Sequence, residues 1–339
     1  MTFQELDLKD SLLDSLDSMG FEKATPIQEQ AIPIIKDGHD LIACAQTGTG
    51  KTAAFLLPVI NNLIDNSVPD SIDALILVPT RELAIQIDRE LTGFAYFTGL
   101  SNTAIYGGRD GDAFSLERKA LATGANIVVA TPGRLIAHLQ MGYVKFSKLR
   151  HLILDEADRM LDMGFISDIQ KIESFTPPTK QTLMFSATMP GKIRTFAKQI
   201  LKNPKQINIA VSKPAEGVLQ TVYEIHSDLK VKLLKQLLTS RPPKEDERIL
   251  IFSSTKVNVK KVAQTLGRSR LSVAEIHSDL DQKQRELTLR EFKNGKAPIL
   301  VATDILSRGI DVKGIDLVIN YDVPGDGEDY IHRVGRTAR

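Results

Sequence analysis

The sequence predicts an α/β protein built from two similar units, each with a mainly parallel sheet flanked by helices. Short apolar runs recur between segments of helix length, and runs that are apolar on both faces are typical of strands covered on both sides. The spacing of apolar residues also predicts helices over residues 53–65 and 81–97. The predicted strands are residues 41–43, 74–78, 127–130, 151–154, 182–185, 249–252, 299–302 and 317–319.

The length and an internal repeat both indicate two domains. A chain of 339 residues is long enough for two domains, each with its own core. A strand that ends in Val-Ala-Thr occurs once in each half, at Thr131 and at Thr303. Between the halves, a polar stretch interrupted by Pro204, Pro214 and Gly217 predicts a linker at residues 209–218, with domains at 1–208 and 219–339. The alternative is a long surface loop within a single domain.

Composition excludes several classes of protein. With 43 basic and 42 acidic residues the net charge is +1, so any surface that binds nucleic acid must be local. A single cysteine, Cys44, cannot form an intramolecular disulfide or a zinc site of thiolates. The start of the chain is acidic and does not resemble a signal peptide, and no apolar run approaches the roughly 18 residues that span a bilayer. We therefore expect a cytoplasmic protein without a membrane partner.

A glycine-rich loop between the first predicted strand and a helix predicts a phosphate site. Glycines let backbone N–H groups turn toward an anion, and the helix N-terminus adds its positive end. Lys51 would supply a cation to the β- and γ-phosphates, and the Thr52 hydroxyl would hold Mg²⁺. The loop is Ala45, Gln46, Thr47, Gly48, Thr49, Gly50, Lys51 and Thr52, and its Ala45 stands where the general pattern has glycine.

An acidic run follows the fourth predicted strand. Carboxylates at the carboxyl end of a parallel strand can hold Mg²⁺ and polarise the attacking water, which assigns Asp155 to the metal and Glu156 to the water. Taken alone, such a run is more often a solvated helix N-terminus. Its combination with Lys51 favours the catalytic interpretation.

The second half has no phosphate loop but ends in an arginine cluster. Phosphoryl transfer needs positive charge at the γ-phosphate, and arginines from another domain can supply it when two domains close. Arg336 and Arg339 are the candidates. The alternative is a basic segment that contacts nucleic acid or solvent.

Further motifs extend this pattern over residues 3–339. They are Phe3, Gly20-Phe21 with Thr25-Pro26-Ile27-Gln28, Pro79-Thr80-Arg81, Gly107-Gly108, Thr131-Pro132-Gly133-Arg134, Asp155 to Asp158, Ser186-Ala187-Thr188, Gln282 to Arg285, Thr303 to Asp311, and His332 to Arg339. Together they resemble the DEAD-box ATP-dependent RNA helicases of superfamily 2, and we expect a bacterial member. The resemblance implies two tandem RecA-like domains. It also implies that the second is incomplete at its C-terminus, because family members continue past this point.

The resemblance further implies roles for residues at the ATP site. Gln28 would read the adenine edge, which selects ATP, and Phe3 and Phe21 would pack near the base. Gly309 and Asp311 would meet the nucleotide from the second domain, with Arg336 and Arg339 on the γ-phosphate. Ser186 and Thr188 would couple the acidic motif to His332. Each residue also has a simpler explanation, because Ser and Thr after strands often cap helices and Phe21 could belong to the core.

The same resemblance implies a surface for single-stranded or short duplex RNA. With 6% aromatic residues and no tryptophan, a groove that stacks successive bases is disfavoured, whereas contacts to the sugar-phosphate backbone fit the residue types. Gly107 and Gly108 could alternatively form only a turn. The RNA-contacting residues would be Pro79, Thr80, Arg81, Gly107, Gly108, Thr131, Pro132, Gly133, Arg134, Arg285 and Thr303.

We therefore expect a monomeric, RNA-stimulated ATPase that unwinds short duplexes. A second hypothesis is an ATP-gated RNA clamp with little unwinding of its own. A third, a DNA translocase, is disfavoured by Gln28 and by the acidic motif.

Overall fold

The computed structural model divides the chain into two compact units, Met1–Val211 and Ser212–Arg339. The two units are described separately. The residues that the structure describes are 1–45, 48–108, 111–209, 218–244, 246–303, 314–324, 330, 333–335 and 337.

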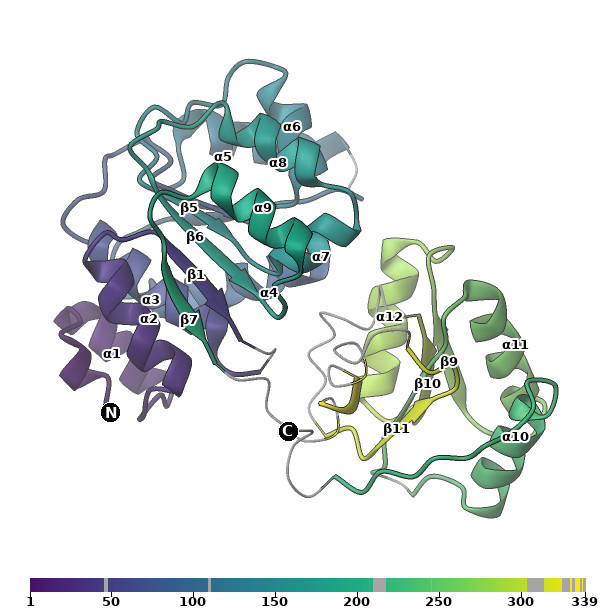
Figure 1. The fold of residues 1–339 in the computed structure, drawn as a ribbon. Coiled ribbons are helices and arrows are strands. Elements are labelled where there is room, and N and C mark those ends of the chain that lie inside the picture. Colours follow the sequence, from purple (N-terminus) through teal and green to yellow (C-terminus); the bar gives the residue numbers. More distant parts are fainter. Residues whose placement is uncertain are drawn as a thin grey trace. The chain divides into compact units, whose positions relative to one another are not determined.

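In the described part of the first unit, the strands form one seven-stranded sheet in the order β3-β4-β2-β5-β6-β1-β7. Figure 1 shows β5, β6, β1 and β7 side by side in this order. Every neighbouring pair is parallel. The strands are β1 (Leu41–Cys44), β2 (Ala74–Leu77), β3 (Asn102–Ile105), β4 (Ile127–Ala130), β5 (His151–Leu154), β6 (Gln181–Ser186) and β7 (Lys205–Asn208).

Helices cover both faces of this sheet because successive strand residues point to opposite sides. Ile153 of β5 packs with the helices α1 to α4, whereas its neighbours Leu152 and Leu154 pack with α6 to α9. The helices are η1 (Gln4–Leu6), α1 (Asp10–Ser18), α2 (Pro26–Lys36), α3 (Lys51–Leu63), α4 (Arg81–Phe94), α5 (Gly111–Thr123), α6 (Pro132–Leu139), α7 (Ala157–Asp162), α8 (Ile166–Glu173) and α9 (Gly191–Ile200).

The second unit repeats this plan on a smaller scale. Its described strands form a parallel sheet in the order β11-β8-β10-β9. Ile249 and Ile251 face a cluster with α10 and α11, and Leu250 and Phe252 face a cluster with Phe292 of α12. The elements are α10 (Lys230–Ser240), β8 (Ile249–Phe252), α11 (Lys256–Gly267), β9 (Val273–Ile276), α12 (Gln282–Lys293), β10 (Ile299–Ala302) and β11 (Leu317–Asn320).

The predicted fold class of two α/β units with parallel sheets is confirmed. All eight predicted strands are present, with ends shifted by at most one residue. The prediction missed β3, β7 and β9, which are three of the four edge strands of the two sheets; the fourth, β11, was predicted. The repeat has a structural counterpart, since β2 pairs with β4 in the first unit and β8 pairs with β10 in the second. Among the described residues, no helix has the length and apolar character needed to cross a bilayer.

Candidate nucleotide and RNA site

The strand order separates the predicted residues along the carboxyl edge of the first sheet. The predicted phosphate, metal and coupling residues of this unit follow β1, β5 and β6, which are adjacent strands, whereas Phe3, Phe21 and Gln28 precede β1. The predicted RNA-contacting residues of this unit follow β2, β3 and β4, which form the neighbouring half of the sheet. One edge of the sheet therefore carries both sets, side by side.

The phosphate loop leaves β1 at Ala45, whose N–H donates to the Ser186 carbonyl at 3.0 Å. Gly48 and Gly50 have φ angles of +87° and +91°, a left-handed conformation that favours glycine. Helix α3 begins at Lys51, so its first N–H groups lie at the loop, as anion binding requires. Thr49 and Thr52 are half-buried in the same segment.

Lys51 and Asp155 are buried charges at this edge, 6% and 3% exposed. Among the described residues, the Lys51 ammonium has no hydrogen-bond partner. Burial raises the pKa of Asp155 to about 7, although the Lys51 charge acts in the opposite direction. A buried ammonium without a partner is costly, so this site is suited to an anion that would pair with Lys51.

Gln28 connects helix α2 to the phosphate loop. Its Oε1 accepts from the Thr25 N–H at 2.8 Å, and its Nε2 donates to the Gly50 carbonyl at 3.1 Å. A carboxamide has two donor hydrogens and two lone pairs. One N–H of Nε2 and one lone pair of Oε1 are therefore left to read a base edge. Nearby, Phe21 is 36% exposed and packs edge-on against Phe3, which is only 1% exposed, so Phe21 shields Phe3 from solvent.

Glu156 has an unusual backbone conformation. Its φ of +51° is left-handed for a residue that has a Cβ, and such strain is concentrated at functional sites. Its N–H donates to Asp155 Oδ1 at 3.0 Å, and its carboxylate accepts from Arg159 Nη1 at 3.3 Å. These contacts fix the orientations of the Asp155 and Glu156 carboxylates, which the sequence assigns to the metal and to the attacking water.

Asp158, for which the sequence predicts no individual role, links the acidic motif to the segment after β6. Its Oδ2 accepts from the N–H groups of Ala187 and Thr188 at 3.2 and 3.0 Å. The Ser186 hydroxyl, fully buried, donates to the Thr188 carbonyl at 2.7 Å. The partners of Asp158, Ala187 and Thr188, lie 29 and 30 residues farther along the chain. No local pattern in the sequence distinguishes Asp158 from its acidic neighbours.

The Arg81 guanidinium lies directly against Gly108. A Cβ at Gly108 would overlap this guanidinium. Gly108 has a φ of +86°, so glycine is required there for space and for conformation. Thr80 caps α4 by accepting from the Leu83 N–H at 3.3 Å, as the simpler explanation anticipated. Pro79 is buried and Gly107 is half-buried.

Arg134 is held inside the unit by residues of α5 that the sequence did not indicate. Its Nε donates to Glu117 Oε2 at 2.8 Å, and its guanidinium lies over the Phe114 ring at 4.6 Å. Glu117 is 3% exposed and also contacts His138 at 3.0 Å, while burial lowers the pKa of His138. Among the other residues of this motif, Thr131 has no side-chain cap contact, Pro132 is buried and Gly133 is exposed.

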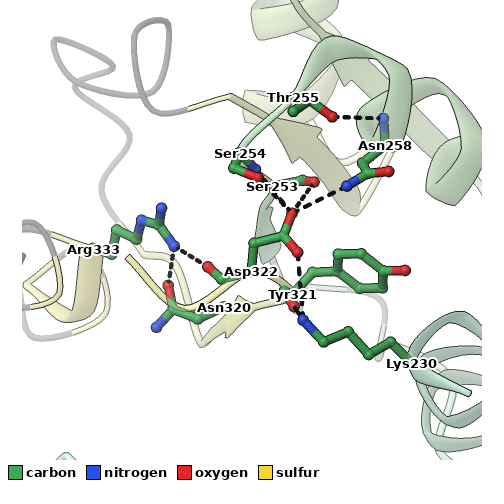
Figure 2. Close-up of polar contacts among 9 residues, drawn as sticks. All are labelled: Lys230, Ser253, Ser254, Thr255, Asn258, Asn320, Tyr321, Asp322 and Arg333. Carbon is green, nitrogen blue, oxygen red and sulfur yellow. Dashed lines mark hydrogen bonds and ion pairs between the residues drawn. The ribbon is translucent and has the colours of Figure 1, made fainter. Parts of the chain in front are cut away.

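A polar cluster lies at the carboxyl ends of β8 and β11 in the second unit (Figure 2). Asp322 accepts hydrogen bonds from Ser253 Oγ at 2.7 Å and from the Ser254 N–H at 3.0 Å. Burial alone would raise the pKa of Asp322, but these hydrogen bonds, with those of Ser254 Oγ and Asn258, lower it. Arg333, 3% exposed, donates to Asn320 Oδ1 at 2.9 Å and to the Asp322 carbonyl at 2.6 Å. Asp322 lies two residues after β11, so a search for acids shortly after strands, a looser form of the pattern that led to Asp155, could have found it.

Two predicted RNA-contacting residues of the second unit are described. Arg285 Nη2 donates to the Ser278 carbonyl at 3.3 Å, and Thr303 is half-buried after β10. The remaining predicted site residues lie outside the described residues: Gln46, Thr47, Gly309, Asp311, His332, Arg336 and Arg339.

Two family models match the chain, one in each of its two compact units. Residues 25–196 match the family model described as DEAD/DEAH box helicase. Residues 229–339 match the model described as helicase conserved C-terminal domain.

Among curated relatives, the ATP-dependent RNA helicase CshA of Listeria monocytogenes is 42% identical over 338 residues. The match covers 99% of this chain and 64% of the relative, so this chain spans less than two thirds of that protein's length. The DEAD-box ATP-dependent RNA helicase CshA of Geobacillus kaustophilus is 41% identical, over 100% of this chain and 71% of the relative.

Solved structures give the same likeness. Dbp5 of S. cerevisiae bound to RNA and ADP BeF3 matches with a TM-score of 0.82 at 29% identity, covering 99% of this chain and 85% of that one. A DEAD box protein from Methanococcus jannaschii matches with a TM-score of 0.60 at 40% identity, covering 100% and 90%.

Proposed function

Because the chain belongs to the DEAD/DEAH box helicase family, we propose that it is the catalytic core of an ATP-dependent RNA helicase. It hydrolyses ATP when RNA is bound and uses that reaction to separate short duplexes without regard to sequence. The observation that carries the proposal is the buried Lys51 ammonium at the start of α3, for which the described residues provide no hydrogen-bond partner. A nucleotide phosphate would supply the missing charge.

The residues present fit Mg²⁺ together with ATP. No group of three His, Cys, Asp or Glu side chains in the described ranges is arranged as a metal site. Mg²⁺ bound with a nucleotide requires only one or two protein ligands, and the Thr52 hydroxyl and Asp155 would provide them. When bound, the ion would neutralise charge on the β- and γ-phosphates. A cation here would also favour the charged form of Asp155, whose pKa burial raises.

The protein's own groups have separate roles in this proposal. Glu156 orients the attacking water and accepts its proton, and Asp158 fixes the Ser186–Thr188 segment beside it. Gln28 uses its remaining donor and acceptor to select adenine, and Phe21 packs against the base. Arg336 and Arg339 supply positive charge to the γ-phosphate, an assignment that rests on the family motif.

RNA is proposed to contact the neighbouring half of the sheet edge. Exposed backbone at Gly108 and Gly133, with the guanidinium groups of Arg81 and Arg134, suits phosphate and sugar oxygens. Such contacts carry no base information, so binding should be independent of sequence and should weaken as salt increases.

Steady-state ATP hydrolysis with and without poly-RNA tests the proposal. RNA should stimulate hydrolysis by the wild-type protein, and Glu156→Gln should lower kcat by roughly 100-fold or more, the usual contribution of a general base. Glu224→Gln, which removes an exposed carboxylate of the second unit, is the control and should leave the rate unchanged. Absence of RNA stimulation, or full activity of Glu156→Gln, would show that the assignment is wrong.

A single-turnover assay with a short RNA duplex then separates a helicase from a clamp. A helicase core separates the strands when ATP is added. RNA-stimulated hydrolysis without strand separation would instead indicate the ATP-gated clamp.

A further inference from the structure

A cavity of about 700 Å³ lies in the first unit at the edge of the sheet opposite the phosphate loop. Asp40, His151 and Gln181 line it, and they stand at the amino ends of β1, β5 and β6. The phosphate loop, Asp155 and Ala187 follow the carboxyl ends of these same strands. A four-residue strand is about 13 Å long, so the cavity is separate from the proposed ATP site.

The floor of the cavity is polar and internally hydrogen-bonded. Gln181 Oε1 contacts His151 Nδ1 at 2.8 Å, and Gln181 Nε2 donates to the carbonyls of Ile35 and His39 at 3.0 and 2.6 Å. The Asp40 carboxylate accepts from two backbone N–H groups, those of Thr182 at 2.8 Å and Lys202 at 2.6 Å. These bonds hold the floor rigid and engage the Asp40 charge within the protein.

The charges that line the cavity are mostly positive. Its cationic side chains are Lys36, Arg150, Lys180 and Lys202, and Asp40 is the acid among the described lining residues. Lys36 is occupied by Asp7 and by the Leu6 carbonyl, and Lys180 pairs with Glu173 at 2.7 Å. With Asp7 and Glu173 counted, one positive charge remains in excess.

Three of these cations still have donors for a ligand. Lys180 and Lys202 each use one donor, on Glu173 and on the Pro178 carbonyl, and an ammonium has three. Arg150 is exposed, and its guanidinium has a donor fork that matches phosphate oxygens. The three cations come from chain segments before β5, before β6 and after α9, and all three line the cavity.

We propose that this cavity binds a small anion that carries phosphate groups, through Arg150, Lys180 and Lys202. Its volume lies in the range of about 300–1,000 Å³ that is usual for sites of small ligands. The lining is mainly charged and amide side chains, with Asn62, Asn66 and Asn203 beside the cations, which suits a polar anion and not an apolar molecule. The proposal does not depend on helicase activity.

Calorimetric titration of the whole chain with inorganic tripolyphosphate tests the proposal. Every titration is carried out in a Lys51→Ala background, which removes the cation of the phosphate loop, so that the remaining heat reports the cavity. Arg150→Glu should weaken binding at least tenfold, because it replaces a phosphate-binding fork with a repelling charge. Lys198→Glu, which makes the same charge change at an exposed position of α9 outside the cavity, should bind as the wild type does.

Lys202→Gln provides a second, milder variant whose folding is checked by thermal melting, and it should also weaken tripolyphosphate binding. The backbone of RNA offers the same phosphate chemistry, so a single-stranded RNA oligonucleotide is titrated in parallel. Loss of tripolyphosphate binding with RNA affinity unchanged supports the small anion. Loss of RNA affinity alone, equal binding with Arg150→Glu and with Arg150 intact, or no binding to the Lys51→Ala protein would overturn the proposal.

Discussion

A missing side chain at Gly50 allows helix α2 to contact the phosphate loop. Gly50 has a φ of +91°, and a Cβ there would lie 2.5 Å from Gln28 Nε2 and 3.0 Å from Thr25 Oγ1. The hydrogen bond from Gln28 to the Gly50 carbonyl therefore depends on glycine at two levels, conformation and space. The identity of this one residue determines how the predicted base-reading group meets the predicted phosphate-binding group.

We predict that Gly50→Ala lowers both the stability and the nucleotide affinity of the protein. The left-handed conformation costs an alanine about 1 kcal/mol, and the overlap with Gln28 adds to that cost and displaces the amide. Gly38→Ala is a matched control, because Gly38 has a φ of +79° with nothing within 4 Å of its Cβ position. Thermal melting and ADP titration of both variants measure the two effects. If Gly50→Ala behaves like Gly38→Ala in both, the close contact with Gln28 does not matter.

At the scale of elements, Asp158 of α7 is the connection between that helix and the end of β6. Oδ2 accepts from Ala187 and Thr188, and Oδ1 accepts from the Arg159 N–H at 3.0 Å, so both oxygens face donors. An asparagine has one acceptor oxygen, and its NH₂ group would face an N–H on the other side. The carboxylate is therefore specifically required.

We predict that Asp158→Asn destabilises the first unit by about 1–3 kcal/mol, the usual cost of leaving buried donors without acceptors. RNA-stimulated ATP hydrolysis should fall as well, because the Ser186–Thr188 segment loses its anchor beside Glu156. Asp14→Asn makes the same charge change at an exposed position of α1 and should alter neither quantity. Denaturant titration and the ATPase assay measure both. Normal hydrolysis by a destabilised Asp158→Asn would limit Asp158 to a structural role.

At the scale of the whole molecule, the sequence predicted what is local and buried. Interior strands such as β5 are buried on both faces and appear as continuous apolar runs. The missed strands β3, β7 and β9 are sheet edges whose residues are mostly half-exposed or exposed, so they lack that pattern. The phosphate loop and the acidic motif are each one continuous run of residues, so both can be recognised in the sequence. The pairing of Glu117 with Arg134 joins two helices and appears only in three dimensions. The functional roles of the site residues remain predictions.

The pH dependence of stability provides a test at this scale, through His151 in the floor of the cavity. Burial lowers the pKa of His151 from its ordinary 6.5 to about 4, so between these values the unfolded chain holds a proton that the folded chain lacks. The stabilisation from the neutral imidazole is complete above pH 6.5 and is lost as the pH falls toward 4. Asp155, with its pKa raised to about 7, acts with the opposite sign, so the wild-type curve alone does not isolate His151.

Comparison with His151→Asn isolates the contribution of His151 to the pH dependence of stability, because both proteins contain Asp155. Asparagine keeps an N–H donor for Gln181 Oε1 and does not titrate. Between pH 7.5 and pH 5 the wild type should lose about 2 kcal/mol more unfolding free energy than the variant, from 1.5 pH units at about 1.4 kcal/mol each. Urea titrations of both proteins across this range measure the difference. Parallel curves would mean that His151 titrates alike in the folded and unfolded states, and hence that the floor of the cavity is open to water.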